Sequence, residues 1–218
     1  GDFVAIHRDN LRRQRPRADP KRRGRGPVDD AQAHWARLHG DDIRVCQRAV
    51  VGQIGVIFHI IGMAALKYFL LRVDPKKNML FDPKESIDFN GNTGPSVQYT
   101  YVRTQAIQRR YAEAHPEFNP KEANSEGHTL STAESEVVAK MYEWPSVLRM
   151  AATTYNPADI AHYSYDLAKL YNAFYQDHQI VKETDEQARN FRLALTYKTG
   201  VVIREAMRLL GISMPDRM

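Results

Sequence analysis

The spacing of the apolar residues after Val50 constrains this sequence most. These residues recur at steps of three and four, and no sustained alternation with a period of two interrupts them. Because helical spacing puts apolar side chains on one face, the chain is predicted to be mostly α. We expect the last four helices to pack as a bundle. The expected ranges are Ala31–Leu38, Ile43–Leu71, Pro95–Ala114, Ser131–Ala152, Pro157–Gln176 and Thr184–Leu210.

Two of the predicted helices carry clear apolar stripes. The stripe of the helix Pro157–Gln176 consists of Ile160, Tyr163, Leu167, Leu170 and Phe174. The stripe of the helix Thr184–Leu210 consists of Phe191, Leu195, Val202, Ala206 and Leu209. Each stripe is predicted to face the core, since residues three and four apart lie on one side of a helix.

Several helix ends carry local signals. Ser131 and Glu134 match a capping box at the start of a helix. Asn156 is predicted to cap the following helix, with Pro157 in its first turn. Gly211 directly follows the last apolar residues and is predicted to take the left-handed conformation that ends a helix.

The positive charge lies almost entirely at the start of the chain. The formal net charge is +5, and residues Gly1 to Arg48 account for all of it, with eleven Arg and one Lys against seven Asp. The segment "LRRQRPRADPKRRGRGP" has no hydrophobic periodicity and is expected to be disordered. Three interpretations remain open: a basic RNA-binding arm, a solvated surface, or residues not native to the parent gene, such as translation in a shifted frame.

Composition restricts the class of protein. With 218 residues and 43% hydrophobic content, the chain can form a real core. Its most apolar stretch, Val50 to Leu71, is interrupted by Gln53, His59 and Lys67, so no membrane span is predicted. A single cysteine, Cys46, cannot form an internal disulfide, and no secretion signal is recognisable, so a cytoplasmic location is expected.

Metal and nucleophile chemistry finds little support in the sequence. The histidines do not occur at metal-ligand spacings, and no metal site is predicted; they include His115, His128, His162 and His178. Cys46 has no recognisable activating partner. No catalytic residue is assigned.

The stretch "FNGNTGPSVQYTYVR", Phe89 to Arg103, predicts a sharp bend and then a helix. Gly91 and Gly94 permit backbone angles that other residues resist, and Pro95 suits a first helical turn. Four residues of that helix fall on one face: Tyr99, Arg103, Ala106 and Arg110. Such a face suits an unstacked base and its phosphates. Alternatively, the tyrosines pack half in the core and the arginines are merely solvated.

Three blocks then carry a family resemblance. They are "IGMAALKYFLL", Ile61 to Leu71; "FDPKESIDFNGNTGPSVQYTYVR", Phe81 to Arg103; and "FRLALTYKTGVVIREAMRLLGISMPDRM", Phe191 to Met218. In order and spacing they resemble the C-terminal part of a bacterial arginyl-tRNA synthetase. The resemblance implies a DALR-type anticodon-binding helical domain over residues 89–218. The segment "RLAL", Arg192 to Leu195, would lie near the sequence motif from which this domain family takes its name. Residues 43–88 would be a remnant of the catalytic domain and residues 1–42 the basic head.

The resemblance also implies binding residues for an arginine tRNA. The loop Gly91, Asn92, Thr93 and Gly94 would lie beside the anticodon. In the "QYxxxR" element, which begins at Gln98, Tyr99 and Arg103 would face the anticodon bases. Tyr175, or alternatively Tyr171, and the terminal Met218 would pack against them.

The catalytic signatures of a class I synthetase are missing. "FHIIG", Phe58 to Gly62, lies too near the anticodon-binding region to be a HIGH motif, and "KRRGRG", Lys21 to Gly26, lacks the Met and Ser of a KMSKS segment. The parent enzyme would use ATP, whereas this chain is expected to bind no cofactor. We expect a monomer that binds arginine tRNA but neither DNA nor membranes.

Two alternatives remain open. One is a helical protein-interaction module without RNA specificity, for which binding would ignore the anticodon sequence. The other is nonspecific RNA binding through the basic head, which deletion of the residues before Asp42 would abolish.

Overall fold

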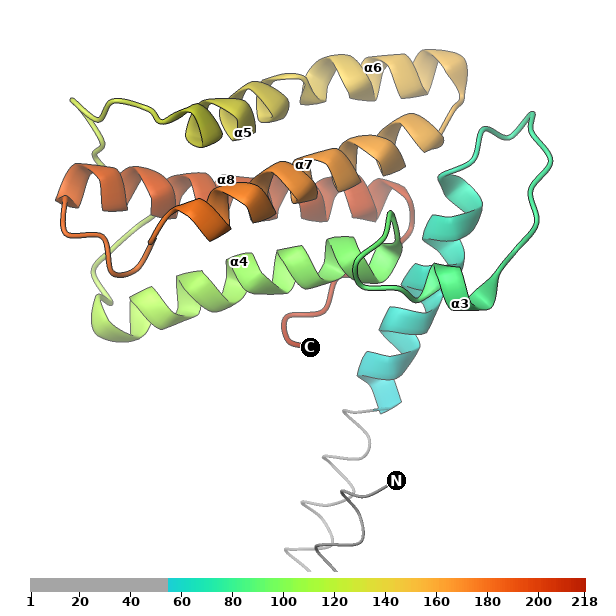
Figure 1. Ribbon diagram of the computed structural model, residues 1–218, viewed down its shortest axis with the longest axis horizontal. Helices are drawn as coiled ribbons and strands as arrows, with labels where there is room; N and C mark the ends of the chain where they lie inside the picture. Colours follow the sequence, from blue (N-terminus) through green and yellow to red (C-terminus); the bar gives the residue numbers. More distant parts are fainter. Residues whose placement is uncertain (1–54) are drawn as a thin grey trace, which may run out of the picture. The chain divides into compact units, whose positions relative to one another are not determined.

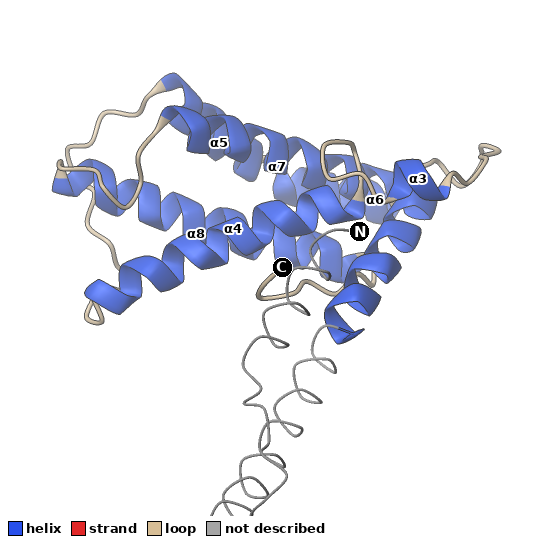
Figure 2. Ribbon diagram, turned by 60° about the horizontal axis from the view of Figure 1, so that its bottom comes forward, coloured by secondary structure: helices blue, strands red, loops and turns tan. Residues whose placement is uncertain are grey.

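The computed structural model describes residues 55–218, and every regular element in that range is helical. A helix covers residues 55–71. The others are α3 (Pro83–Ser86), α4 (Gly94–Ala114), α5 (Thr132–Tyr142), α6 (Trp144–Thr154), α7 (Ala158–Asp177) and α8 (Glu186–Leu209). Figure 2 shows these helices joined by loops, which confirms the predicted fold class. The predictions on the basic head, Cys46, the helix Ala31–Leu38 and the first part of Ile43–Leu71 lie outside the described residues.

The helices α4 to α8 form the predicted bundle. Helix α7 contacts α4, α5, α6 and α8, and α4 also packs on α8. In Figure 1, α5 and α6 follow one another along the upper side of α7, α4 lies along its lower side, and α8 passes behind α7. The core contains these fully buried side chains: Val97, Leu167, Tyr171, Phe174, Leu193, Ile203 and Met207. Burial of such side chains contributes roughly 1.5–3 kcal/mol each.

The predicted single helix Ser131–Ala152 is in fact two helices. Helix α5 ends at Tyr142, and α6 starts at Trp144 with Pro145 in its first turn. Proline has no N–H to continue the hydrogen-bond ladder of the preceding helix, so the chain restarts there. The capping box is confirmed: the Ser131 N–H donates to Glu134 Oε2 at 2.8 Å, and the Glu134 N–H donates to Ser131 Oγ at 3.2 Å.

The two predicted apolar stripes differ in outcome. The α7 stripe is confirmed, because four of its five residues are buried and Leu170 is partly buried. The α8 stripe is only partly right, since Leu209 is 46% exposed whereas Leu193, Ile203 and Met207 are fully buried. Helix α8 packs against α4, α5 and α7 together, and its buried side is therefore wider than one stripe.

The ends of α7 and α8 follow the local signals. The Ala158 N–H donates to the Asn156 side-chain oxygen at 3.2 Å, so Asn156 caps the first turn although α7 is assigned from Ala158. Gly211 has φ +67°, and the Ile212 N–H donates to the Met207 carbonyl at 2.9 Å. The left-handed glycine therefore ends α8 as predicted.

A buried carboxylate joins α5 to α8. Glu134 is fully buried, and its Oε1 accepts from Arg192 Nε at 2.7 Å while its Oε2 lies 3.0 Å from His128 Nε2. Burial opposes ionisation, but the hydrogen bonds from Arg192, the Ser131 N–H and His128 outweigh it and lower the pKa of Glu134 from 4.5 to about 2. The predicted "RLAL" segment thus contributes Arg192 to the interior of the fold.

The helix of residues 55–71 packs onto the bundle rather than standing apart from it. The Tyr68 hydroxyl oxygen lies 2.8 Å from the Ala161 carbonyl oxygen in α7, and both residues are fully buried. The predicted domain boundary at residues 88 and 89 is therefore crossed by core contacts. No helix within residues 55–218 is long and apolar enough to cross a membrane.

Candidate nucleic-acid interface

The loop before α4 is held by its own side chains and by the helix of residues 55–71. Thr93 is the N-cap of α4: its hydroxyl accepts from the Ser96 N–H at 3.3 Å and donates to the Asp88 carbonyl. The Asn92 carbonyl accepts from Arg72 Nη1 at 2.7 Å, and its side-chain Oδ1 lies 2.6 Å from the Tyr68 hydroxyl. These contacts fix the loop in one conformation.

The structure gives Gly94 of this loop a different role from the predicted one. Neither Gly91 nor Gly94 has a positive φ, so the expectation of unusual backbone angles is wrong. A Cβ on Gly94 would instead lie 2.4 Å from the Ala64 carbonyl oxygen. Gly94 therefore permits two helices to approach closely, and this contact sets where α4 begins. Pro95 is in the first turn of α4, as predicted.

An exposed cluster forms where α4 meets α7. We call Phe89, Tyr99, Arg103 and Tyr175 the Arg103 cluster. The guanidinium carbon of Arg103 lies 4.9 Å from the ring centroid of Tyr99 and 4.8 Å from that of Tyr175. Phe89 meets Tyr99 edge to face, with ring centroids 6.4 Å apart. Tyr99 is 46% exposed and Tyr175 38%, so a cation and two aromatic rings are accessible together.

Helix α7 supplies a further contact that the sequence did not reveal. The Asn172 side-chain oxygen accepts from Arg103 Nη1 at 2.6 Å. Asn172 lies one turn before Tyr175, so α7 presents an amide and a ring to the same guanidinium. No motif marks this asparagine, because its role depends on the packing of α7 against α4.

The structure separates the two tyrosines that the sequence left as alternatives. Tyr171 is fully buried, and its hydroxyl lies 3.2 Å from Thr196 Oγ1. Burial raises the pKa of its phenol well above the ordinary value of 10. Tyr171 thus belongs to the core, and Tyr175 alone of the pair reaches the surface beside Arg103.

Gln98 is buried in the structure, whereas Met218 is exposed. Gln98 is fully buried and its Nε2 donates to the Ser213 carbonyl at 2.7 Å, so the predicted contact of this side chain with RNA does not fit the structure. Arg109 Nη1 donates to the Asp216 carbonyl at 3.1 Å. Helix α4 thereby holds the C-terminal segment at two points, and the terminal Met218 is exposed.

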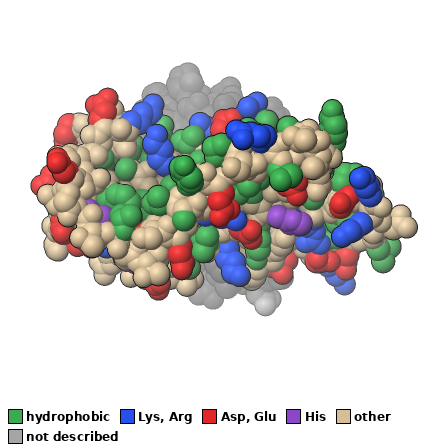
Figure 3. Space-filling view, turned by 90° about the horizontal axis from the view of Figure 1, so that it is seen from above, with side chains coloured by type: hydrophobic (Ala, Val, Ile, Leu, Met, Phe, Trp, Pro, Cys, Tyr) green, Lys and Arg blue, Asp and Glu red, His purple; other side chains and the backbone are tan. Residues whose placement is uncertain are grey.

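Arg110 and Ala106 continue the predicted face of α4. Both are exposed, as the spacing indicated. Over the side of the molecule that carries α5 and α6, by contrast, Lys and Arg side chains alternate with Asp and Glu, and no broad basic area stands out (Figure 3). That side offers no electrostatic preference for a phosphate backbone.

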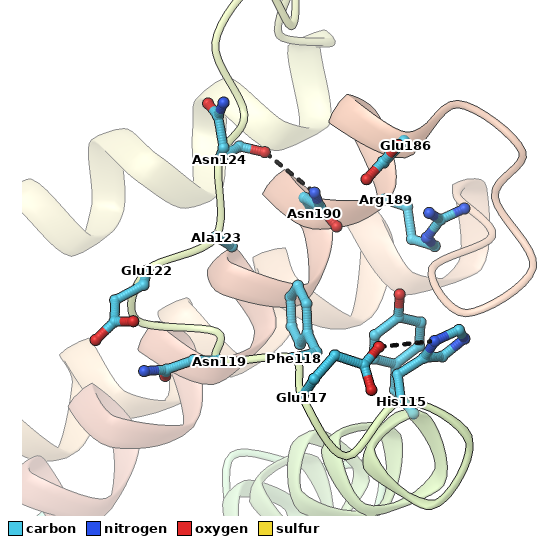
Figure 4. A pocket seen from close by; sticks show the side chains of 11 residues that line it. His115, Glu117, Phe118, Asn119, Glu122, Ala123, Asn124, Glu186, Arg189 and Asn190 are labelled. Atoms are coloured by element: carbon cyan, nitrogen blue, oxygen red, sulfur yellow. Dashed lines mark hydrogen bonds and ion pairs between the residues drawn. The ribbon is translucent and has the colours of Figure 1, made fainter.

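A pocket of about 530 Å³ lies at the other end of α4. Figure 4 shows it between the end of α4, the loop of residues 117–124 and the start of α8. Glu117, Glu122 and Glu186 line it together with one arginine, Arg189. Three carboxylates against one guanidinium disfavour phosphate groups, so this pocket suits neither an RNA backbone nor a nucleoside triphosphate. Residues 55–218 also contain no group of three His, Cys, Asp or Glu side chains placed to hold a metal ion.

Comparison with solved structures supports the fold. The Thermus thermophilus arginyl-tRNA synthetase matches with a TM-score of 0.65 at 24% identity, over 73% of this chain and 27% of that chain. The Plasmodium falciparum arginyl-tRNA synthetase matches with a TM-score of 0.62 at 21% identity, over 84% of this chain and 33% of that chain.

Sequence comparison identifies the family. Arginine–tRNA ligase of Phocaeicola vulgatus is 49% identical over 165 residues, which is 74% of this chain and 26% of that protein. The corresponding ligase of Porphyromonas gingivalis is 49% identical over 162 residues, 74% of this chain and 27% of that protein. The chain thus spans about a quarter of the length of the curated relatives it matches. The model of the DALR anticodon binding domain matches residues 97–218. The chain therefore belongs to the DALR anticodon-binding domain family.

Proposed function

We propose that this chain binds the anticodon region of an arginine tRNA. The observation that carries the proposal is the Arg103 cluster, in which a cation and two exposed tyrosine rings lie on rigid helices of a DALR-family domain. Unpaired RNA bases stack on aromatic rings or guanidinium planes, and each stacked base contributes about 1–3 kcal/mol. The cluster offers both kinds of surface.

The neighbouring segments complete the proposed site. The loop Gly91 to Gly94 leads into α4 and is held by Arg72 and the Asp88 carbonyl; Gly91 and Asn92 are partly exposed and are the part of it that RNA could reach, whereas Thr93 and Gly94 are buried. The C-terminal segment with Met218 runs along the same helix. We include Asn92, Tyr99, Arg103, Tyr175 and Met218 in the contact surface and leave out Gln98 and Tyr171.

The proposal also covers the reaction of a longer protein that contains this chain. A protein that contains this chain would attach arginine to its tRNA with ATP in the cytoplasm, and this chain would contribute tRNA selection as a monomer. The residues of the acidic pocket do not fit a triphosphate, so we assign no ATP site to it.

The test is binding of an arginine tRNA transcript, compared with a transcript whose central anticodon base is changed, at low and moderate salt. Tyr99→Ala should weaken binding of the native transcript roughly 5- to 150-fold, which corresponds to 1–3 kcal/mol, and remove the preference between transcripts. The control is Tyr142→Ala, since Tyr142 is 88% exposed at the end of α5, away from the cluster.

The alternative functions give different results in the same assay. Equal and steeply salt-dependent binding of both transcripts, unaffected by Tyr99→Ala, would leave only nonspecific attraction to basic residues. A lack of RNA binding at low salt would favour the protein-interaction module. Either result would refute the proposal.

A further inference from the structure

We propose that Asn172 is a positioning residue of this RNA site, which holds the Arg103 guanidinium beside the two tyrosine rings and leaves its positive charge for the RNA. The inference rests on the proposed function and adds a residue that lies outside the segments from which that function was predicted. It concerns how Arg103 is prepared for binding before RNA arrives.

Hydrogen bonding fixes the orientation of the Asn172 amide. Arginine can only donate, so the oxygen of Asn172 must face Arg103 Nη1, 2.6 Å away. The amide nitrogen donates to Thr100 Oγ1 at 2.9 Å, and that hydroxyl donates to the Ser96 carbonyl at 3.2 Å. Both ends of the amide are therefore satisfied, and a flipped amide would place a donor against the guanidinium.

The supporting residues are rigid. Thr100 is fully buried in α4, and Asn172 is part-buried in α7 between the buried Tyr171 and the Arg103 cluster. Arginine has a long side chain that loses much rotamer freedom when it is ordered. Because Asn172 orders Arg103 within the free protein, less of that loss remains for the binding step.

The neutral amide matters as much as its position. Three other arginines of the described residues contact carboxylates: Arg72 pairs with Glu85 at 2.5 Å, Arg192 with Glu134 at 2.7 Å and Arg208 with Glu205 at 2.9 Å. Arg103 forms no ion pair with an Asp or Glu of residues 55–218. An asparagine therefore accepts its hydrogen bond without cancelling its charge, as a site for an anion requires.

Asn172→Asp separates this role from a structural one. A carboxylate would keep and strengthen the hydrogen bond to Arg103 but lose the one that the amide nitrogen donates to Thr100 Oγ1, so thermal stability should change little. Binding of the arginine tRNA transcript should nevertheless weaken about tenfold, and the slope of log K against log salt should fall by about one, as for the loss of one phosphate contact. Asn172→Leu should weaken binding similarly by releasing the guanidinium.

The matched control is Asn190→Asp, which adds the same charge to α8 beside the acidic pocket and should leave RNA affinity within twofold of wild type. Wild-type anticodon preference together with unchanged affinity of Asn172→Asp would overturn this inference alone. A wild type without anticodon preference would overturn the proposed function and this inference with it.

Discussion

A single methyl group at Gly94 tests the contact that positions the candidate site. A Cβ atom there would lie 2.4 Å from the Ala64 carbonyl oxygen, 2.7 Å from its carbonyl carbon and 3.0 Å from Tyr68 Cβ. Carbon and carbonyl oxygen atoms approach to about 3.3 Å even in their closest favourable contacts. The helix of residues 55–71 and the start of α4 would therefore have to separate by about 1 Å.

Gly94→Ala is expected to lower the free energy of unfolding by an amount at the upper end of the range for overpacked cores. Inserted carbons cost about 1–3 kcal/mol when side chains can adjust, and here the nearest atoms belong to the Ala64 backbone. We expect a loss of about 3 kcal/mol in the free energy of unfolding, which lowers the Tm of a chain of this size by about 6–12 °C.

Gly62→Ala is the matched control for this change. Gly62 lies within the helix of residues 55–71, and a Cβ there meets no atom within 4 Å. The same substitution should raise stability by about 0.5–1 kcal/mol through helix propensity alone. Urea unfolding of the full chain, followed by circular dichroism, measures both variants. If Gly94→Ala is as stable as wild type, the close approach of Gly94 to Ala64 does not determine how α4 packs on the helix of residues 55–71.

Two further predictions concern buried groups. The pKa of Glu134 is about 2 in the folded state, against an ordinary value of 4.5. The ionised carboxylate therefore contributes about 3 kcal/mol to the free energy of unfolding. This contribution is complete above pH 4.5 and is lost as the pH falls to 2. Glu134→Gln should flatten this part of the acid-unfolding curve, and a curve parallel to that of wild type would contradict the assignment. Tyr171→Phe loses the hydroxyl contact with Thr196 and should cost about 1 kcal/mol of stability at unchanged RNA affinity, whereas Tyr175→Ala should weaken RNA binding with little effect on unfolding. An RNA-binding defect in Tyr171→Phe would show that the burial argument is wrong.

The helices could be predicted from the sequence because their signals are local. The α7 stripe, the capping box at Ser131 and the left-handed Gly211 each involve residues within a few positions of one another. The orientation of α8 could not be predicted in this way. Its buried side depends on three neighbouring helices, and a single stripe at helical spacing identifies only part of that surface.

The sequence indicated which residues form the candidate site, but not how those residues are arranged. Spacing placed Tyr99 and Arg103 on one face, and the structure confirms that they are neighbours. Spacing did not show that Gln98 turns inward toward Ser213, a residue 115 positions away. It also could not choose between Tyr171 and Tyr175, because residues four apart lie on nearly the same side of a helix.

The arrangement of α4 explains why the chain's last residues can belong to a site built near its middle. Gln98 and Arg109 hold the carbonyls of Ser213 and Asp216, whereas Tyr99 and Arg103 face outward from the same helix. Each residue adds about 100° around a helix, so Gln98 and Arg109 share one side of α4 and Tyr99 and Arg103 share the adjacent side. The buried Gln98 therefore helps to fix the C-terminal segment against α4, the helix that also carries Tyr99 and Arg103.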